Sequence, residues 1–289
     1  MSAGLGADER RQGWLLVAPA LLVVAAVALY PIVAGVWLSL HRVILVFHEQ
    51  RFVGLDNFAF LLEDQRFHGA LLRTLLFTVV AVALELGLAL PLALLLDRRA
   101  ARGLLLAALL MPWAVPTAVS SRLWAWLLNP DHGVLIRLWP GAGPDLFAEP
   151  TLALLAAVLV DVWKTTPFVT LILLAGLQAI PQDLYRAAAV DGATRWQTFR
   201  TVTLPLLRPA LALALLLRAL DAFRVFDAIW VLTAGGPANG TETLSVYAFK
   251  TLMRTGDFGY GSALALVTFA CSCALALLLS RLARAEAQP

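Results

Sequence analysis

The chain has 289 residues, of which 61% are hydrophobic and only 14% are charged, and its mean hydropathy is +0.81. Soluble domains are roughly 45–50% apolar, so this composition excludes a soluble globular protein and predicts one that lies in lipid. The net charge of +3 is explained by the distribution of arginines described below, and it gives no argument for a nucleic-acid partner.

Six segments are long and apolar enough to cross a bilayer as helices, since a hydrocarbon core about 30 Å thick needs roughly 20 mostly apolar residues. We therefore predict an all-α, polytopic membrane protein with about six transmembrane helices in a single domain over residues 1–289. The segments between them are too short for a separate soluble domain. The predicted spans are residues 14–40, 71–96, 104–128, 152–177, 204–232 and 262–282.

The first span follows two arginines, as the apolar region of a signal peptide does, but it is nearly twice the usual length of about 7–15 residues. We interpret it as a retained first helix. Counting Lys and Arg in the loops favours cytoplasmic termini, because cytoplasmic loops carry the excess of positive charge. That excess is concentrated in residues 97–102, between the second and third spans. The arginines assigned to the inside are Arg10, Arg11, Arg98, Arg99, Arg102, Arg186, Arg195, Arg200, Arg208, Arg281 and Arg284, against Arg42, Arg51, Arg66, Arg73, Arg137, Lys250 and Arg254 outside.

No catalytic or metal-binding site is predicted. Histidines at 41, 48, 68 and 132 are scattered over the predicted outer loops, whereas catalysis or metal binding needs convergent partners. We interpret them as solvated loop residues. Cys271 and Cys273 stand two apart in the last span and point to different faces of a helix, which argues against a disulfide or a metal site.

The longest cytoplasmic connection, residues 178–203, has the sequence of two short helices rather than of a linker. Pro181 is suited to a helix start, and Ala187 to Ala189 are small enough to let another surface approach closely. Gly192 permits a turn, after which Thr194 can cap a second helix. On these residues alone, docking to a cytoplasmic partner and simple anchoring at the membrane surface both remain open.

Residues 185–193, Tyr-Arg-Ala-Ala-Ala-Val-Asp-Gly-Ala, followed by Val-Thr-Leu-Pro at 202–205, resemble the EAA loop of ABC importer permeases. In that family the loop forms a coupling helix that sits in a cleft of the ATPase subunit, so the resemblance favours docking. One position departs from the pattern, because Arg186 stands where the family has Glu. The predicted ATPase-coupling residues are Tyr185, Arg186, Ala187, Ala188, Asp191, Gly192, Ala193, Leu204 and Pro205.

Other stretches look like the carbohydrate-uptake permeases, and within them the chain is similar to the first permease subunit of maltose, trehalose or glycerol-phosphate systems. They are residues 111–116, 162–168, 175–181 and 231–237. The resemblance implies a type I ABC importer permease in a bacterial or archaeal inner membrane. It also implies a heterodimer with a second permease, a pair of ATPase subunits, a solute-binding protein outside the cell, and a di- or oligosaccharide as substrate. A glycerol phosphate or a polyol is the alternative.

Import against a gradient needs an energy source, and a phosphate-binding loop needs a Gly-rich turn followed by Lys and Ser or Thr. The two lysines, Lys164 and Lys250, follow no such turn. We therefore expect ATP and Mg²⁺ on the partner ATPase, with no cofactor bound by this chain and no enzymatic activity of its own.

Charges buried in lipid usually face a cavity or a partner, and eight ionisable residues are predicted to be in this position. They are Glu85, Arg122, Asp161, Lys164, Arg218, Asp221, Arg224 and Asp227. The last four stand three apart, so neighbours can pair along one helix, and mutual neutralisation remains an open alternative to a role in transport. Maltose-type relatives hold sugar on the corresponding spans, which implies a substrate path formed by Trp163, Lys164, Thr165, Phe168, Arg218, Asp221, Ala222 and Val225.

Two other function classes are the alternatives to an importer permease. An ion-coupled secondary carrier could use Glu85 and Asp161 as proton relays, but it is expected to have related halves and has no need of an ATPase-docking loop. An enzyme embedded in the membrane needs convergent histidines or acids at a membrane edge, and the sequence contains no such motif.

Overall fold

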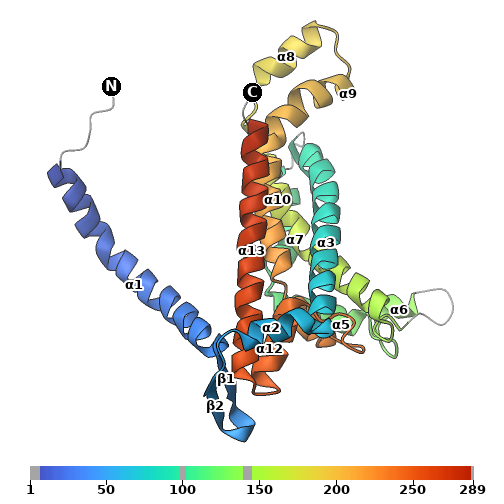
Figure 1. Cartoon of the computed structure of the whole chain (residues 1–289). Helices are drawn as coiled ribbons and strands as arrows, with labels where there is room; N and C mark the ends of the chain where they lie inside the picture. The colour runs from blue at the N-terminus through green and yellow to red at the C-terminus, as the bar shows by residue number, and fades with distance from the viewer. Residues whose placement is uncertain (1–6, 98–101, 139–144, 288–289) are drawn as a thin grey trace. The chain divides into compact units, whose positions relative to one another are not determined.

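The computed structural model describes residues 7–97, 102–138 and 145–287. For residues 7–10, 46, 102 and 283–287 it describes the backbone only. Helices make up most of this part of the chain (Figure 1). Its internal contacts define two compact units, residues 1–64 with 248–267 and residues 65–247 with 268–289. The arginines at 98 and 99, on which much of the predicted orientation depends, lie outside the described residues.

The first unit contains a long apolar helix and a small hairpin. Helix α1 spans Ala7–Ser39, and the hairpin pairs β1 (His41–Ile44) with β2 (Glu49–Phe52) around a short 3-10 turn, Leu45–Phe47. Helix α2 (Asp56–Glu63) follows. The side-chain amide of Asn57 donates to the carbonyl oxygens of Ser39 (2.8 Å) and His41 (3.0 Å), which fixes α2 to the start of the hairpin.

The last two helices connect the units along the chain. Helix α12 is Leu244–Met253, and α13 is Phe258–Ala287, so each begins in one unit and ends in the other. Within the first unit, the Tyr260 hydroxyl donates to Asp64 Oδ2 at 2.6 Å.

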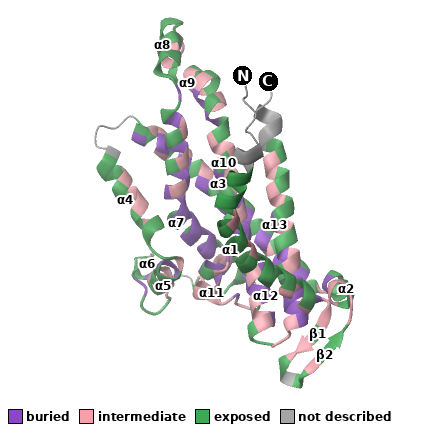
Figure 2. Ribbon diagram, turned by 90° about the vertical axis from the view of Figure 1, so that its left-hand side faces the viewer, coloured by how far each residue is buried: buried purple, intermediate pink, exposed green. Residues whose placement is uncertain are grey.

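The second unit is built on three long helices, α3 (Gln65–Asp97), α7 (Pro150–Gln178) and α10 (Leu204–Phe223), which pack against one another. In the most apolar 18-residue stretch of α7, 72% of the residues are buried, against 33% in the corresponding stretch of α3. Helix α7 is therefore the central helix of the unit (Figure 2). The shorter helices around them are α4 (Arg102–Ala114), α5 (Thr117–Leu127), α6 (Val134–Arg137), α8 (Gln182–Val190), α9 (Arg195–Thr198) and α11 (Asp227–Thr233).

Two hydrophobic clusters hold these helices together. One surrounds Phe77, Val158 and Ile229, and the other surrounds Leu173 and Leu207, all of them nearly or fully buried. Lipid tails are as apolar as these side chains, so close van der Waals packing and interhelical polar contacts, rather than removal of apolar surface from water, hold α3, α7, α10 and α11 together.

Five of the described helices are long and apolar enough to cross a membrane, and α4 with α5 makes a sixth if that bent pair is counted as one span. The predicted span 104–128 is therefore broken, with an angle of 89° between its halves. Pro116 lies at the break, and it has no N–H to continue the helical ladder. The predicted span 204–232 is also interrupted, because α10 ends at Phe223 and the chain turns before α11 begins at Asp227.

Candidate functional site

The predicted docking loop is a helical elbow, by which we mean α8, α9 and the turn between them. Thr194 caps α9 as the sequence predicts: its hydroxyl accepts from the Gln197 backbone N–H, and its own N–H donates to Gln197 Oε1 at 2.8 Å. Gly192 has φ +73°, a left-handed conformation that glycine adopts without strain. Figure 1 shows α8 and α9 together at one end of α10.

Most predicted coupling residues lie on the surface of this elbow. Ala187, Asp191 and Gly192 are exposed, while Ala188 and Ala193 are half-buried. Arg186 pairs with Asp183 at 3.0 Å, and both side chains are largely exposed. Leu204 and Pro205 lie apart from the α8 residues in sequence and form the first turn of α10. The two groups are linked by a hydroxyl contact of 3.3 Å between Tyr185 and Thr203.

The elbow continues into α10 without interruption. A five-residue π-helical turn, Phe199–Thr203, joins α9 to α10, so that residues 195–223 form one 29-residue helical segment. At the far end of this segment stands Arg218. A displacement of α9 would therefore act along a continuous helix on the centre of the unit.

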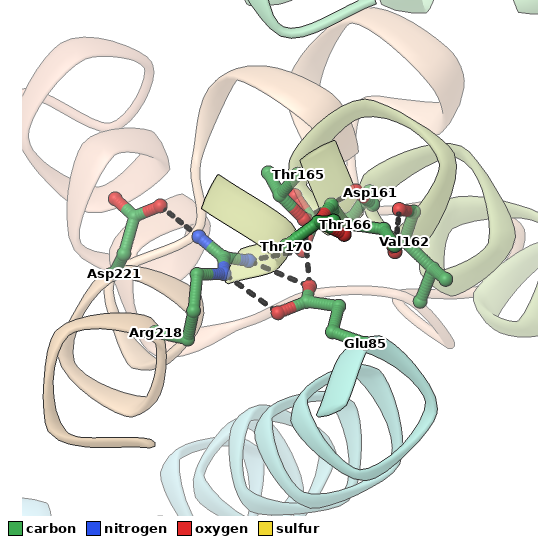
Figure 3. Close-up of polar contacts among 8 residues, drawn as sticks. All are labelled: Glu85, Asp161, Val162, Thr165, Thr166, Thr170, Arg218 and Asp221. Carbon is green, nitrogen blue, oxygen red and sulfur yellow. Dashed lines mark hydrogen bonds and ion pairs between the residues drawn. The ribbon is translucent and has the colours of Figure 1, made fainter. Parts of the chain in front are cut away.

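That centre holds an ionic core, which we define as Glu85, Asp161, Arg218 and Asp221 (Figure 3). Arg218 Nε and Nη2 donate to the two carboxylate oxygens of Glu85 at 2.6 and 2.7 Å, and Nη2 also donates to Asp161 Oδ2 at 3.0 Å. Nη1 donates to Asp221 Oδ2. The Thr165 hydroxyl lies 2.7 Å from Glu85 Oε1. One guanidinium thus connects carboxylates from α3, α7 and α10.

The ionic core changes the interpretation of Arg218. Its side chain is 2% exposed and that of Glu85 is fully buried, and four of the five guanidinium N–H groups are engaged. A buried charge is tolerated only when it is paired and hydrogen-bonded in this way. Asp221 differs, since its side chain is 69% exposed while it keeps its bond to Arg218.

The predicted pairing at every third residue of α10 occurs only once. Arg218 pairs with Asp221, but Arg224 Nε donates to the Leu220 carbonyl oxygen at 3.2 Å. Asp227 belongs to the next helix, α11, because α10 ends at Phe223. The predicted pairing required one helix to continue through residues 224–226, where the chain instead turns.

Lys164 supports the break between α4 and α5. Its ammonium group donates to the carbonyl oxygens of Val115 at 2.7 Å and Trp113 at 3.3 Å. Carbonyls at the end of a helix have no partner within it, and a cation there also interacts favourably with the helix dipole. The ammonium group of Lys164 therefore takes the place of the helical hydrogen bonds that end at the break.

Aromatic contacts join α7 to both halves of the broken pair. Phe168 stacks on Trp113 of α4 with ring centroids 5.6 Å apart, and Trp163 meets Trp124 of α5 edge-on at 5.4 Å. The predicted path residues thus fall into three groups. Thr165, Arg218 and Asp221 join at the ionic core, the α7 residues Trp163, Lys164 and Phe168 contact the broken pair, and Ala222 and Val225 lie in the hydrophobic cluster.

A second buried ion pair was missed from the sequence. Glu242 is fully buried, and Arg66 Nε and Nη2 donate to its carboxylate at 2.7 and 2.9 Å. Arg73 Nε donates to the Glu242 carbonyl oxygen at 3.0 Å. These bonds fix the segment before α12 to the start of α3. No local signal marks Glu242, which lies between two threonines in a segment that the sequence assigns to an outer loop.

Comparisons with known proteins agree with this architecture. Residues 85–287 match the family model described as "Binding-protein-dependent transport system inner membrane component". The trehalose/maltose transport system permease protein MalF of Thermococcus litoralis is 46% identical over 265 residues, which cover 90% of each chain. The trehalose transport system permease protein SugA of Mycobacterium tuberculosis is 41% identical over 282 residues, covering 96% of this chain and 91% of that one.

Among solved structures, a chain of a bacterial ABC transporter involved in the import of the acidic polysaccharide alginate superposes with a TM-score of 0.82. The match covers 96% of this chain and 97% of that chain at 22% identity, so it concerns the fold. The family and fold expected from the sequence are confirmed. The chain belongs to the family of binding-protein-dependent transport system inner membrane components, and it is a transport subunit with the fold of an ABC importer permease.

Proposed function

We propose that the chain is one of two permeases of an ATP-driven importer that takes up a di- or oligosaccharide. The observation that carries this proposal is the 46% identity to a trehalose/maltose permease over 90% of both chains. The 41% identity to a trehalose permease over 96% of this chain points to the same substrate class.

A glycerol-containing substrate is the second candidate. The sulfoquinovosyl glycerol transport system permease protein SmoG of Agrobacterium fabrum is 34% identical over 98% of this chain. Because that relative is less similar than the two trehalose permeases, the disaccharide is favoured. Membership of the importer family argues against an ion-coupled secondary carrier.

The remaining subunits follow from the family. We expect a second permease, a pair of ATPase subunits that bind ATP and Mg²⁺, and a solute-binding protein on the outer side of the inner membrane. Both termini of this chain are then cytoplasmic, as the distribution of arginines indicates.

In this proposal the ATPase binds the exposed face of the elbow. When ATP drives the two ATPase subunits to close on each other, the elbow moves with them. The movement passes along residues 195–223 to Arg218, whose bonds to Glu85 and Asp161 couple it to α3 and α7. Such a rigid arrangement suits rocking between inward-open and outward-open states, an equilibrium that shifts only through differential binding.

The side chains best suited to meet the sugar are Asp221 and Trp163. The Asp221 carboxylate is 69% exposed and can accept hydrogen bonds from hydroxyl groups, and the Trp163 ring is 37% exposed and can stack on the apolar face of a pyranose. Arg218 and Lys164 act behind them, the first by holding Asp221 and the second by holding the broken helix pair.

Substitutions in the elbow test the docking part of this proposal. A β-branched residue at 192 would be strained at φ +73°, although its Cβ would meet no atom of the described residues within 4 Å. In the assembled complex we expect Gly192→Val to uncouple ATP hydrolysis from sugar uptake. Gly192→Asn, which tolerates the left-handed conformation, should retain more coupling.

Arg186→Ala is the matched control within the same elbow. Exposed ion pairs such as that of Arg186 with Asp183 contribute about 0–1 kcal/mol, so this variant should stay close to wild type. Uptake and substrate-stimulated ATP hydrolysis are measured side by side in proteoliposomes. Full coupling in Gly192→Val would exclude residues 185–193 as the docking element.

The substrate class is tested on the solute-binding protein that functions with this permease. A thermal-shift screen against trehalose, maltose, longer oligosaccharides, glycerol phosphates and polyols should single out a disaccharide or oligosaccharide. Stabilisation by a glycerol phosphate alone would favour the second candidate.

A further inference from the structure

A groove of about 1030 Å³ lies between the end of α3 and the elbow. We call it the elbow groove. Pro91, Leu94 and Leu95 of α3 form one wall, and Arg195, Trp196 and Phe199 form much of the other. We propose that the elbow groove binds an anionic phospholipid, with the phosphate at Arg195 and an acyl chain along α3.

The α3 wall has the chemistry of a surface that faces acyl chains. Leu94 and Leu95 belong to the last turn of a helix that is long and apolar enough to cross the membrane. Leu95 is 50% exposed, and Pro91 beside it is exposed as well. With 33 residues α3 is about 50 Å long, so this end of the helix lies near the boundary of the hydrocarbon core, where acyl chains meet headgroups.

The elbow wall has the chemistry of the membrane interface. The Trp196 ring is 68% exposed and stacks on Phe199 with centroids 5.5 Å apart. Tryptophan is enriched where hydrocarbon meets headgroups, since its ring is apolar and its N–H is a donor. The helical segment 195–223 has 29 residues and is about 44 Å long, so its first turn extends past a hydrocarbon core about 30 Å thick. Arg195 and Trp196 therefore reach headgroup depth.

The positive charge in the elbow groove favours an anionic headgroup. Among the described residues that line the groove, Arg195 is the one charged side chain and none is a carboxylate, and Arg195 makes no ion pair with any described residue. Its planar guanidinium can donate two parallel hydrogen bonds to a phosphate. The groove thus combines one cationic end with a long apolar wall, which matches an anionic phospholipid.

The position of this groove has a consequence for transport. Tyr185, Ala189 and Ala193 of the elbow also line it, so a bound lipid would brace the element proposed to receive the ATPase from the membrane side. Transport coupling should then depend on anionic lipid. This inference rests on the membrane location of the chain, and it holds whichever sugar is carried.

The test uses the complete transporter in nanodiscs and compares Arg195→Gln with Arg200→Gln. Arg200 lies on the same helical segment, is exposed and does not line the groove, so it is a matched control for overall charge. Retained phosphatidylglycerol and phosphatidylcholine are counted by native mass spectrometry. We expect wild type and Arg200→Gln to retain phosphatidylglycerol preferentially, and Arg195→Gln to bind it about tenfold more weakly.

A second pair of variants tests the apolar wall. Leu95→Trp should fill the groove and displace the lipid, whereas Leu88→Trp, at a residue of α3 that is similarly exposed and does not line the groove, should not. Equal loss of phosphatidylglycerol in both arginine variants, or no preferential retention by wild type, would overturn the proposal. So would an Arg195→Gln transporter that keeps its lipid but releases its ATPase, because the groove would then be a protein contact. ATPase docking through residues 185–193 would survive the first two results.

Discussion

The ionic core and the elbow use charge in opposite ways. In the core, Arg218 is 2% exposed, and its carboxylate partners come from three helices of the same chain. In the elbow, Arg186 and Asp183 pair at 3.0 Å with side chains 79% and 87% exposed, and most of the neighbouring residues of α8 and the turn are exposed as well. The core is therefore complete within this chain, whereas the elbow has the features of a surface whose partner is another subunit.

This difference teaches where each kind of substitution should act. A substitution in the ionic core leaves a buried charged group without its partner, and it should lower the stability of the folded chain. A substitution in the elbow leaves the fold intact and should impair the coupling of ATP hydrolysis to uptake in the assembled transporter. The broken helix pair lies between these cases, because Lys164 bonds backbone atoms of its own chain beside the proposed sugar path.

The largest effect is expected from Arg218→Met, which leaves Glu85 and Asp161 buried without their cation. Breaking a buried ion pair by removing one partner costs about 3–5 kcal/mol. We expect low yield and a marked fall in thermal stability of the purified transporter, measured by fluorescence-detected unfolding. Arg224→Met, just past the end of the same helix, is the control and should change the free energy of unfolding by about 0.5 kcal/mol or less. Equal stability of the two variants would mean that the ionic core is not structural.

An intermediate effect is expected from Lys164→Met, which leaves the Val115 and Trp113 carbonyl oxygens without their donor. A hydrogen bond to a charged group contributes about 1.5–3 kcal/mol. Uptake should fall for every substrate by the same factor, and spin labels on α4 and α5 should report a broader distance distribution. Lys164→Arg keeps a cation and should be milder. A change confined to the apparent KM for sugar, with stability unaltered, would instead make Lys164 a sugar ligand.

The smallest effect on stability is expected from Asp221→Ala, because this carboxylate is 69% exposed and Arg218 keeps its bonds to Glu85 and Asp161 without it. Uptake should nevertheless fall while the ATPase stays bound, since Asp221 is proposed to meet the sugar. Both are measured on one preparation, by transport assay and by co-purification. Normal uptake would leave Asp221 with the role of neutralising Arg218 only.

Local features of the fold were predictable from the sequence. Long apolar runs predict helices, and Thr194 predicts the start of α9, because a capping interaction involves residues only three apart. Gly192 at the turn of the elbow is predictable for the same reason. The family resemblance, which rests on such local motifs, was confirmed by the relatives.

The arrangement of the charged groups was not predictable. Glu85 and Arg218 are 133 residues apart, and no local rule pairs them. The role of Lys164 depends on a break near Val115, 49 residues away in the sequence. Hydropathy alone predicts one continuous span there. Spacing along α10 suggested four residues pairing in series, but the helix ends after the first pair. Tertiary contacts therefore decided which polar residues support the fold and which remain accessible.

The sequence separation within the ionic core also constrains how the protein is made. Translation at about 5–20 residues per second takes roughly 7 to 27 s to proceed from Glu85 to Arg218, which are 133 residues apart. During that interval α3 enters the membrane with a carboxylic acid whose cation has not yet been synthesised. Until α10 follows, this group lacks its cation, and a chain that ends between Asp161 and Arg218 contains two acids without the cation that pairs with them. Such truncated chains should be recognised as defective by membrane quality control, whereas chains interrupted after α10 should persist longer.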